Sequence, residues 1–540
     1  MKKIIVTLFV SLLLILSFII VFRTLLDKPL FDTAKGVDVY LDGIKDDKYE
    51  HLLINNKIYI SAKYLADNEL IDYYWDKDYN KISIFNNFNY DVINYNEKKA
   101  FYNKKPYDIN EVMLVDNGEL YFNTEFINDN YVDRLYVDIK NSNVIIEINI
   151  REYEVIKNTR LKTYAASRAG TLQKIYKGEH IYVYNNEYNG WILVRISSEQ
   201  GTDIGYVKLS DLKPISKVKY DTYQSLNKSE KIRMAWDLIY KRIDNFQPFE
   251  IPNAIDIIGP TWFDLEDTDE IFKDLSNDDY IKYVKESNKD IWAVFNNSFD
   301  PELTGKLLND GIKRSEIVDR IVDITMNKDF DAINIDFENI YLKDKDVFSA
   351  FLKELYCKAK EKGLLLTVDI TIMSNAENWS LCYDRNVVSK YSDYIMLMAY
   401  DENVSEVVGS VSSLPWVEYG VKNILEYSPS EKIVLSIPFY TRLWEENLNL
   451  QQKVKSTALK IDSAKKAIDE LGINLIYDDS TGQNFGEVTI DGIKYSIWNE
   501  DETSLTNRLD ILNKYNLSGY AVWALKYGNN EVWQLFENKK

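Results

Sequence analysis

Two acidic residues in the C-terminal half of the chain lie where a buried strand should be apolar. Residues 330–338 alternate, with apolar side chains on one face and Asn334, Asp336 and Glu338 on the other, because strand side chains alternate with period two. Two carboxyls so placed are about 6–7 Å apart at the backbone. In a confined space they repel each other, so one holds a proton near neutral pH, which suits general acid–base chemistry. The alternative is a buried polar cluster with a structural role only, although three inward polar residues exceed what packing needs.

Other polar and aromatic residues end or follow the neighbouring apolar runs. These candidates are Asp369, Met398, Tyr400, Asp401, Tyr440, Arg442 and Trp523. Each is weak evidence alone, because an aromatic residue at a strand end is usually part of the packing. They gain weight together, because the carboxyl ends of parallel barrel strands meet at one mouth, where barrel active sites form.

The pattern of residues 216–540 predicts the scaffold that would bring these candidates together. Short apolar runs alternate with helical patterns, which implies a parallel sheet. The predicted strands are 254–259, 291–295, 332–337, 364–370, 394–399, 433–437 and 519–523. Helical faces appear over 314–326 and 347–362, and Gly363 suits the position after the second helix. An α/β fold follows, a (β/α)8 TIM barrel of about 250 residues with insertions. Residues 231–236 would supply the missing first strand, although a helix fits them equally well.

These motifs resemble a known family. Asp331-x-x-Asn334-x-Asp336-x-Glu338 resembles the Asp-x-x-Asp-x-Asp-x-Glu signature of glycoside hydrolase family 18, the chitinase-like hydrolases. Met398-Ala399-Tyr400-Asp401 resembles that family's Met-x-Tyr-Asp strand end, and Trp523 matches the strand-end Trp beneath its −1 sugar. The run Gly259–Phe263 and the Asn-Ile-Asp-Phe-Glu variant are most similar to the bacterial branch related to spore-cortex and cell-wall N-acetylglucosaminidases. Asn334 departs from the signature, because an amide carries neither charge nor a transferable proton.

The resemblance implies a retaining, substrate-assisted mechanism that requires no metal and no cofactor. Glu338 would act as general acid and base, Asp336 would orient the substrate acetamide, and Tyr400 would bond its oxygen. Substrate binding would fall to Asn334, Asp369, Met398, Asp401, Tyr440, Arg442 and Trp523. The expected partner is a cell-wall glycan that contains β-linked N-acetylglucosamine.

Two alternatives stay open at this point. The same chemistry could be directed at chitin or N-glycans, because loops decide the subsites, and Trp262, Trp379 and Trp444 are candidate linings. The barrel could also bind wall glycans without cleaving them. Lectin-like relatives, however, typically lose the acid that Glu338 supplies here.

Two smaller domains are predicted ahead of the barrel. Within 36–150, Ile58–Ser61 aligns with Leu120–Asn123, and each copy is typical of a strand, a short helix and a hairpin. This duplicated α+β pattern resembles the amine-oxidase N-terminal-like stalk domain of bacterial surface proteins. Residues 153–213 have short strands separated by turns, which predicts a small all-β barrel. The runs Gly190–Arg195 and Gly205–Val207 resemble the bacterial Src-homology-3-like domain.

Residues 1–35 predict a signal-anchor and its juxtamembrane segment. Lys2 and Lys3 precede the apolar stretch Ile4–Phe22, which just spans a hydrocarbon core of about 30 Å. No small-x-small cleavage site follows it. We therefore expect one uncleaved transmembrane helix at the cell membrane, with the catalytic region on the extracytoplasmic side. Cleavage would instead give a secreted protein.

Composition excludes several functional classes. Acidic residues number 85 and basic residues 65, and the net charge of −20 argues against a nucleic-acid partner. Two cysteines and two histidines exclude a disulfide scaffold and a metal centre built on cysteine or histidine. Catalysis must therefore rest on carboxylates, hydroxyls or lysines. The 40 tyrosines are compatible with sugar binding.

Overall fold

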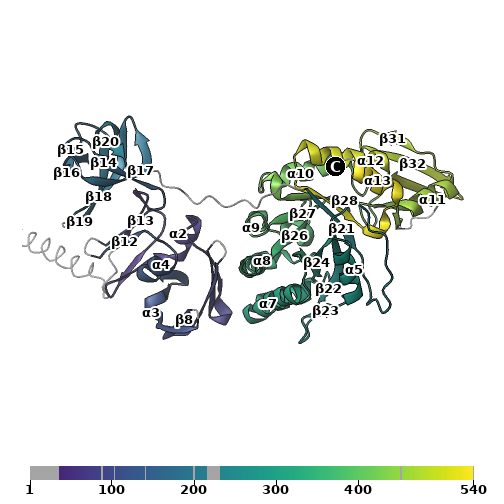
Figure 1. The fold of residues 1–540 in the computed structure, drawn as a ribbon, viewed down its shortest axis with the longest axis horizontal. Helices are drawn as coiled ribbons and strands as arrows, with labels where there is room; N and C mark the ends of the chain where they lie inside the picture. The colour runs from purple at the N-terminus through teal and green to yellow at the C-terminus, as the bar shows by residue number, and fades with distance from the viewer. Residues whose placement is uncertain are drawn as a thin grey trace, which may run out of the picture. The chain divides into compact units, whose positions relative to one another are not determined.

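The computed structural model describes residues 36–86, 89–102, 104–139, 142–198, 201–215, 231–449 and 453–538. The chain divides into two compact units. Residues up to 73 together with 94–223 form the first, and residues 74–93 together with 224–540 form the second. Figure 1 labels the elements of both.

The first unit contains two small sheets with strand orders β12-β13-β1-β2 and β10-β11-β4-β3. Their strands are β1 (Asp38–Leu41), β2 (Ile44–Lys45), β3 (Leu52–Ile54), β4 (Lys57–Ser61), β10 (Met113–Asp116), β11 (Glu119–Asn123), β12 (Leu135–Asp138) and β13 (Asn143–Ile146). Helices α2 (Ala62–Asp67) and α4 (Thr124–Asn130) directly follow β4 and β11. Ser61 and Asn123, equivalent in the repeat, both cap these helices with their side chains. The strand–helix part of the predicted repeat is therefore present in both copies.

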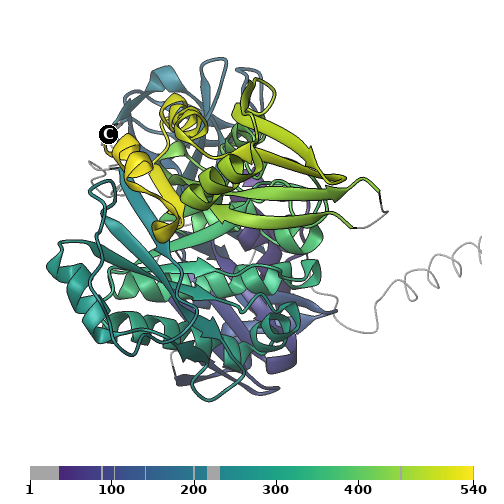
Figure 2. The same cartoon turned by 90° about the vertical axis from the view of Figure 1, so that its right-hand side faces the viewer.

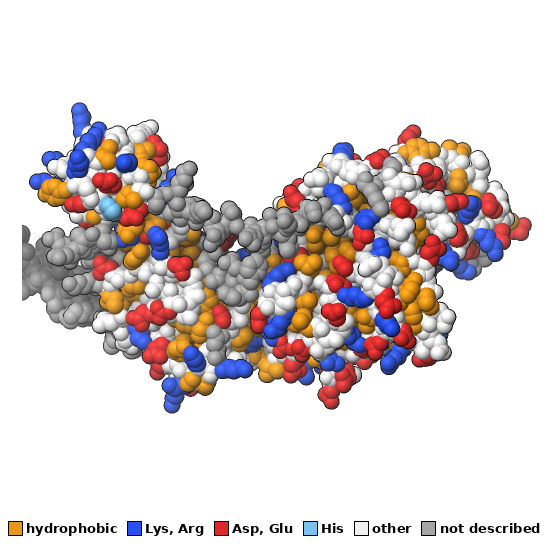
Figure 3. Space-filling view, in the orientation of Figure 1, with side chains coloured by type: hydrophobic (Ala, Val, Ile, Leu, Met, Phe, Trp, Pro, Cys, Tyr) orange, Lys and Arg blue, Asp and Glu red, His pale blue; other side chains and the backbone are white. Residues whose placement is uncertain are grey.

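Residues 150–214 of the first unit form a seven-stranded antiparallel sheet with order β16-β15-β19-β18-β17-β14-β20. Its strands are β14 (Ile150–Val155), β15 (Thr159–Lys162), β16 (Thr171–Ile175), β17 (His180–Tyr188), β18 (Trp191–Ser198), β19 (Gly201–Lys208) and β20 (Leu212–Pro214). Asn189 and Gly190 both have positive φ, as the turn that Asn-Gly predicts requires. Figure 3 shows Lys and Arg side chains over the end of this region near β15 and β16. The region is all-β as expected, and its likeness to a Src-homology-3-like barrel stays a prediction.

Eight parallel strands close into a barrel in the second unit. They are β21 (Ile232–Asp237), β22 (Ile257–Leu265), β24 (Asp290–Asn296), β25 (Ala332–Asp336), β26 (Leu365–Thr371), β27 (Tyr394–Met398), β28 (Ile433–Pro438) and β34 (Gly519–Trp523). Strand β21 pairs with both β34 and β22, which closes the ring. Residues 232–236 are therefore part of a strand rather than a helix. The predicted (β/α)8 barrel is confirmed.

Helices surround the barrel, as Figures 1 and 2 show. They include α5 (Asp278–Glu286), α6 (Pro301–Asn309), α7 (Gly311–Asn327), α8 (Lys345–Glu361), α9 (Arg385–Lys390), α10 (Leu414–Ile424), α12 (Glu502–Lys514) and α13 (Asn530–Asn538). The apolar faces expected for α7 and α8 are buried against the sheet, as at Ile317, Ile321, Phe351 and Leu355. Gly363 has a φ of 73°, the left-handed conformation expected after α8.

The barrel carries a large insertion between β28 and α12, and the sequence pattern, which predicted insertions, did not indicate its place or its fold. Residues 440–499 form a five-stranded antiparallel sheet with order β30-β29-β33-β32-β31 and the helix α11 (Ile461–Leu471). Its strands are β29 (Tyr440–Asn447), β30 (Lys455–Lys460), β31 (Ile476–Asp478), β32 (Gln483–Ile490) and β33 (Ile493–Asn499). This yellow-green extension lies between β28 and α12 in the chain (Figure 2). It brings β29 to the mouth of the barrel.

Among the residues that the structure describes, no helix is both long and apolar enough to cross a bilayer. The predicted signal-anchor, Ile4–Phe22, lies outside those residues and stays a prediction. The boundaries predicted at 36–150, 153–213 and 216–540 also stay predictions.

Candidate active site

Strand β25 places Asn334 and Asp336 inside the barrel, where they are 0% and 5% exposed. Hydrogen bonds fix the Asn334 amide from two sides. Its Oδ1 accepts from Nε1 of Trp236 at 2.9 Å, and its Nδ2 donates to Oδ1 of Asp369 at 2.6 Å. The side chains predicted at 334 and 369 are thus brought together, and they contact each other.

Gly259 on β22 makes room for the Trp236 ring. A Cβ at Gly259 would lie 3.0 Å from Cδ1 of Trp236 and 2.2 Å from Cε of Met234. The same strand carries Trp262, which is fully buried among rings that include Tyr280. Trp262 is therefore a core residue, and its predicted place in a subsite is wrong, because its side chain points to the helices.

The Asp336 carboxyl is buried, and its Oδ1 has no hydrogen-bond partner among the described residues. Burial raises the pKa of Asp336 to about 7. Asp369 on β26 is also buried. Burial, and then the charges of Asp336 and Glu338, raise the pKa of Asp369, while the hydrogen bond from Asn334 lowers it. With both pKa values raised, this pair of carboxyls keeps a proton near neutral pH.

Glu338 follows β25 and is held through its backbone. Nδ2 of Asn297 donates to the Glu338 carbonyl at 2.7 Å, and the Glu338 N–H donates to Oδ1 of Asn297 at 3.0 Å. Burial, and then Asp336 and Asp401, raise the pKa of the Glu338 carboxyl well above its usual range. Glu338 thus has the proton that a general acid needs. The sequence analysis missed Asn297, whose only signal is a pair of asparagines after an apolar run.

A second buried residue supports the same turn. The Tyr383 hydroxyl donates to the Phe337 carbonyl at 2.9 Å, directly before Glu338. Tyr383 is 1% exposed. The sequence analysis missed Tyr383, because it lies in the segment between β26 and α9 and belongs to no alternating pattern.

Tyr400 and Trp523 lie together at the mouth of the barrel, after β27 and at the end of β34. Their ring centroids are 6.3 Å apart and the ring planes differ by 29°. Trp523 also contacts Trp236, with 5.8 Å between ring centroids. Burial, and then Asp336, Asp369 and Glu338, raise the pKa of Tyr400, so its phenol stays protonated and can donate a hydrogen bond.

Asp401, Tyr440 and Arg442 form the rim of the site. The Tyr440 hydroxyl donates to Oδ1 of Asp401 at 2.6 Å, and Nη2 of Arg442 lies 3.6 Å from the same oxygen. Tyr440 and Arg442 belong to β29 of the insertion. The predicted residues at 401, 440 and 442 therefore lie together, although they come from two different parts of the barrel domain.

A cavity of about 400 Å³ opens beside Glu338, a volume that suits a small ligand. Its lining residues are Glu338, Thr371, Ile372, Ser374, Ala376, Trp379, Met398, Tyr400, Asp401, Glu402, Val404 and Trp416. Trp379, a predicted lining, is among them. Trp444 is not, because it is fully buried and its Nε1 donates to the Gly409 carbonyl at 2.9 Å. Trp416 lines the cavity without having been predicted.

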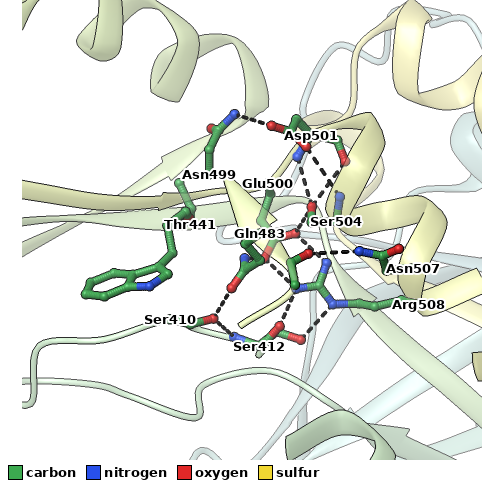
Figure 4. A network of polar contacts seen from close by, with 12 residues as sticks. Ser410, Ser412, Thr441, Gln483, Asn499, Glu500, Asp501, Ser504, Asn507 and Arg508 are labelled. Atoms are coloured by element: carbon green, nitrogen blue, oxygen red, sulfur yellow. Dashed lines mark hydrogen bonds and ion pairs between the residues drawn. The ribbon is translucent and has the colours of Figure 1, made fainter. Parts of the chain in front are cut away.

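A buried polar network anchors the segment that follows Tyr400 (Figure 4). Arg508 on α12 forms an ion pair with Glu500, with Nη1 2.5 Å from Oε2, and its Nε donates to the Ser412 hydroxyl at 2.9 Å. That hydroxyl donates in turn to the Ala399 carbonyl at 2.6 Å. Because Ala399 directly precedes Tyr400, the network links α12 to the position of the Tyr400 ring.

The family model described as glycosyl hydrolases family 18 matches residues 262–528, which include Glu338, Asp336, Tyr400 and Trp523. These residues form a family 18 glycosyl hydrolase domain.

Curated relatives match the family 18 domain at low identity. The uncharacterized glycosylase YvbX of Bacillus subtilis is 23% identical over 265 residues, 47% of this chain and 76% of that protein. The cortical fragment-lytic enzyme of B. subtilis is 23% identical over 259 residues, 45% of this chain and 58% of that enzyme. The putative sporulation-specific glycosylase YdhD is matched over 55% of its length. The chain therefore spans little more than half of two of these relatives.

Solved structures share the fold. The spore cortex-lytic enzyme SleL of Bacillus megaterium has a TM-score of 0.51 at 19% identity, covering 58% of this chain and 75% of that one. A chitinase from Chromobacterium violaceum has a TM-score of 0.50 at 20% identity, covering 57% and 99%.

Proposed function

We propose that the family 18 domain is a retaining glycoside hydrolase that cleaves β-linked N-acetylglucosamine bonds in peptidoglycan. The observation that carries this proposal is the meeting of Glu338, Asp336, Tyr400 and Trp523 at one mouth of the barrel, beside a cavity. Its similarity to cortical fragment-lytic and spore cortex-lytic enzymes also supports the choice of peptidoglycan as substrate.

The reaction uses the substrate's own acetamide as nucleophile. The acetamide oxygen attacks the anomeric carbon, and the bond to the leaving oxygen breaks as Glu338 donates its proton to that oxygen. Asp336 accepts a hydrogen bond from the acetamide N–H and stabilises the positive charge of the cyclic intermediate. The Tyr400 hydroxyl donates to the acetamide oxygen, and the Trp523 ring supports the sugar.

The second half of the reaction restores the enzyme. The Glu338 carboxylate takes a proton from water, and the water oxygen attacks the anomeric carbon from the face that the leaving group left. The bond to the acetamide oxygen then breaks. Two inversions give net retention, and Glu338 is again protonated. No side chain forms a covalent bond with the sugar.

The experiment compares the full chain with the variant Glu338→Gln on purified cell wall and on chitin oligomers. We expect new reducing ends from wall glycan with the wild-type chain and none with the variant, while sugar binding persists in both. Mass spectrometry of the products identifies the cleaved bond. Cleavage of chitin oligomers alone would replace peptidoglycan by chitin as the substrate, and binding without any product would establish a non-catalytic wall-binding protein instead.

Membrane attachment is a separate part of the proposal, and it rests on the apolar stretch Ile4–Phe22 alone. We expect the full chain to stay with the membrane fraction after carbonate extraction, with the barrel on the extracytoplasmic side. Release into the medium would indicate cleavage.

A further inference from the structure

Asp336 and Asp369 occupy adjacent positions on neighbouring strands. Strands β25 and β26 are parallel, and their register pairs Ile335 with Val368. The residues that come next along each strand are Asp336 and Asp369, and both side chains point into the barrel. Neighbouring strands lie about 4.8 Å apart. Asp336 is 5% exposed and Asp369 2%. Two buried carboxyls are therefore close neighbours.

The two carboxyls are held differently. Nε1 of Trp236 can only donate, and it donates to Oδ1 of Asn334, so the NH2 group of Asn334 must face Asp369. That contact is 2.6 Å long and fixes the Asp369 carboxyl in place. Asp336 has no such fixed partner, because its Oδ1 is buried without a hydrogen bond among the described residues. One carboxyl is anchored and the other is available to the substrate.

The groups that act on this pair are acids and phenols. Glu338 faces it from the end of β25, Tyr400 from the end of β27 and Tyr383 from the segment before α9, and Asp401 acts on Glu338 from the rim. Within the described residues no Lys or Arg contributes to the electrostatics of Asp336 or Asp369. Two adjacent buried carboxyls without a cation do not both ionise, so the pair keeps a proton.

We propose that Asp369 is a positioning residue that shares one proton with Asp336 and takes it when Asp336 presents its charge to the substrate acetamide. The proton leaves an oxygen of Asp336 and binds an oxygen of Asp369, and no other bond changes. Asn334, which cannot hold the proton, orients the neighbour that does. This inference rests on the proposed hydrolase function. It gives Asn334 and Asp369 positioning roles beside Asp336, in place of the direct substrate contacts that the resemblance implies, because both side chains are buried and bonded to each other.

The test exchanges the acid and the amide across their hydrogen bond. In the full chain, Asp369→Asn removes the proton acceptor, and the double variant Asn334→Asp with Asp369→Asn restores an acid on the opposite side of the same contact. Thr367→Val is the matched control, because Thr367 also points inward from β26 and its hydroxyl, among the residues described, donates to the Ile333 carbonyl alone. Activity is measured as kcat and KM on wall glycan from pH 4 to pH 9.

In the variant Asp369→Asn, Asp336 loses the neighbouring acid that stabilises its negative charge. We expect the acidic limb of kcat/KM to move up by about one pH unit or more, and kcat at pH 6 to fall about tenfold while KM changes less than about threefold. The double variant should bring the limb back toward the wild-type position, and Thr367→Val should leave it in place. An unmoved limb in Asp369→Asn, or a loss of activity that the double variant does not reverse, would overturn the proposal.

A substrate-free measurement separates this inference from the proposed function. Infrared difference spectra follow the C=O stretch of protonated carboxyls as the pH rises. We expect Asp369→Asn to change the step at which Asp336 titrates, with the Asp336→Asn spectrum used to assign it. An Asp336 step that is unaffected by Asp369→Asn overturns the shared proton. If Asp336 and Asp369 titrate together but the chain cleaves no glycan, the proposed hydrolase function is refuted and the shared proton is still supported.

Discussion

The Tyr400 ring lies nearly parallel to the Trp523 ring, with 6.3 Å between the centroids and 29° between the planes. The two residues are 123 positions apart in the chain, and they meet because β27 and β34 both flank β28 in the barrel. Trp523 packs on Trp236, which holds Asn334. The aromatic residues at the mouth of the barrel are therefore connected to the buried polar residues through Trp236.

Trp523→Ala should lower kcat/KM by about 10- to 100-fold, because the sugar loses the aromatic surface on which it packs, a loss of about 1.4–2.7 kcal/mol. Trp523→Phe keeps a ring at this position and serves as the matched variant, with a loss below about tenfold. Steady-state kinetics on wall glycan fragments measure both. Equal losses in the two variants would show that packing of the barrel, and not the ring face, sets the effect.

Glu338→Gln should make the folded protein more stable at alkaline pH. The folded-state pKa of Glu338 is raised, so its carboxyl contributes stability that is fully present below the unfolded pKa of about 4.3 and is lost as the pH rises through the folded pKa. Glutamine has no charge to bury. We expect equal unfolding temperatures near pH 4 and a higher one for the variant at pH 8, measured by calorimetry. A variant less stable than wild type at pH 8 would contradict the buried, protonated acid.

Alternation of apolar and polar residues over 330–338 sufficed to predict Glu338 and Asp336 as candidates, because a buried parallel strand is otherwise nearly all apolar. The strand ends at Tyr400 and Trp523 followed from the repeated strand–helix pattern. The barrel itself was predictable for the same reason, and α7 and α8 from their apolar faces.

Contacts between distant residues could not be predicted in the same way. Trp236 and Asn334 lie 98 positions apart, and Asn297 and Glu338 lie 41 apart. Each contact depends on which strands become neighbours and on the direction of one side chain. Trp262 and Trp444 were assigned to subsites because a Trp after an apolar run has the same pattern whether it points to the mouth or to the core. The sheet over 440–499 has strands of mixed exposure, so alternation there gave no clear signal.

Arg508→Met should destabilise the barrel domain by about 3–5 kcal/mol, because it leaves the Glu500 carboxylate buried without its cation. The double variant Glu500→Gln with Arg508→Met removes both charges and should recover part of that loss. Chemical unfolding followed by tryptophan fluorescence measures both. We also expect kcat to fall in Arg508→Met, since the Ser412 hydroxyl then loses the Arg508 donor that orients it toward the Ala399 carbonyl, next to Tyr400. If the single and double variants have the same free energy of unfolding, the loss of stability does not come from the uncompensated Glu500 charge.

Asp401→Asn should shift the alkaline limb of kcat to lower pH. The charge of Asp401 is one of the causes that raise the pKa of Glu338. Without it the Glu338 anion meets less repulsion, so Glu338 loses its catalytic proton at a lower pH. Tyr440→Phe is the matched control, because it removes the 2.6 Å hydrogen bond to Asp401 and keeps the charge. The pH dependence of kcat from pH 5 to pH 10 measures the shift. A limb that moves equally in both variants would show that Tyr440 positions Asp401 and that its hydrogen bond, not the charge, governs Glu338.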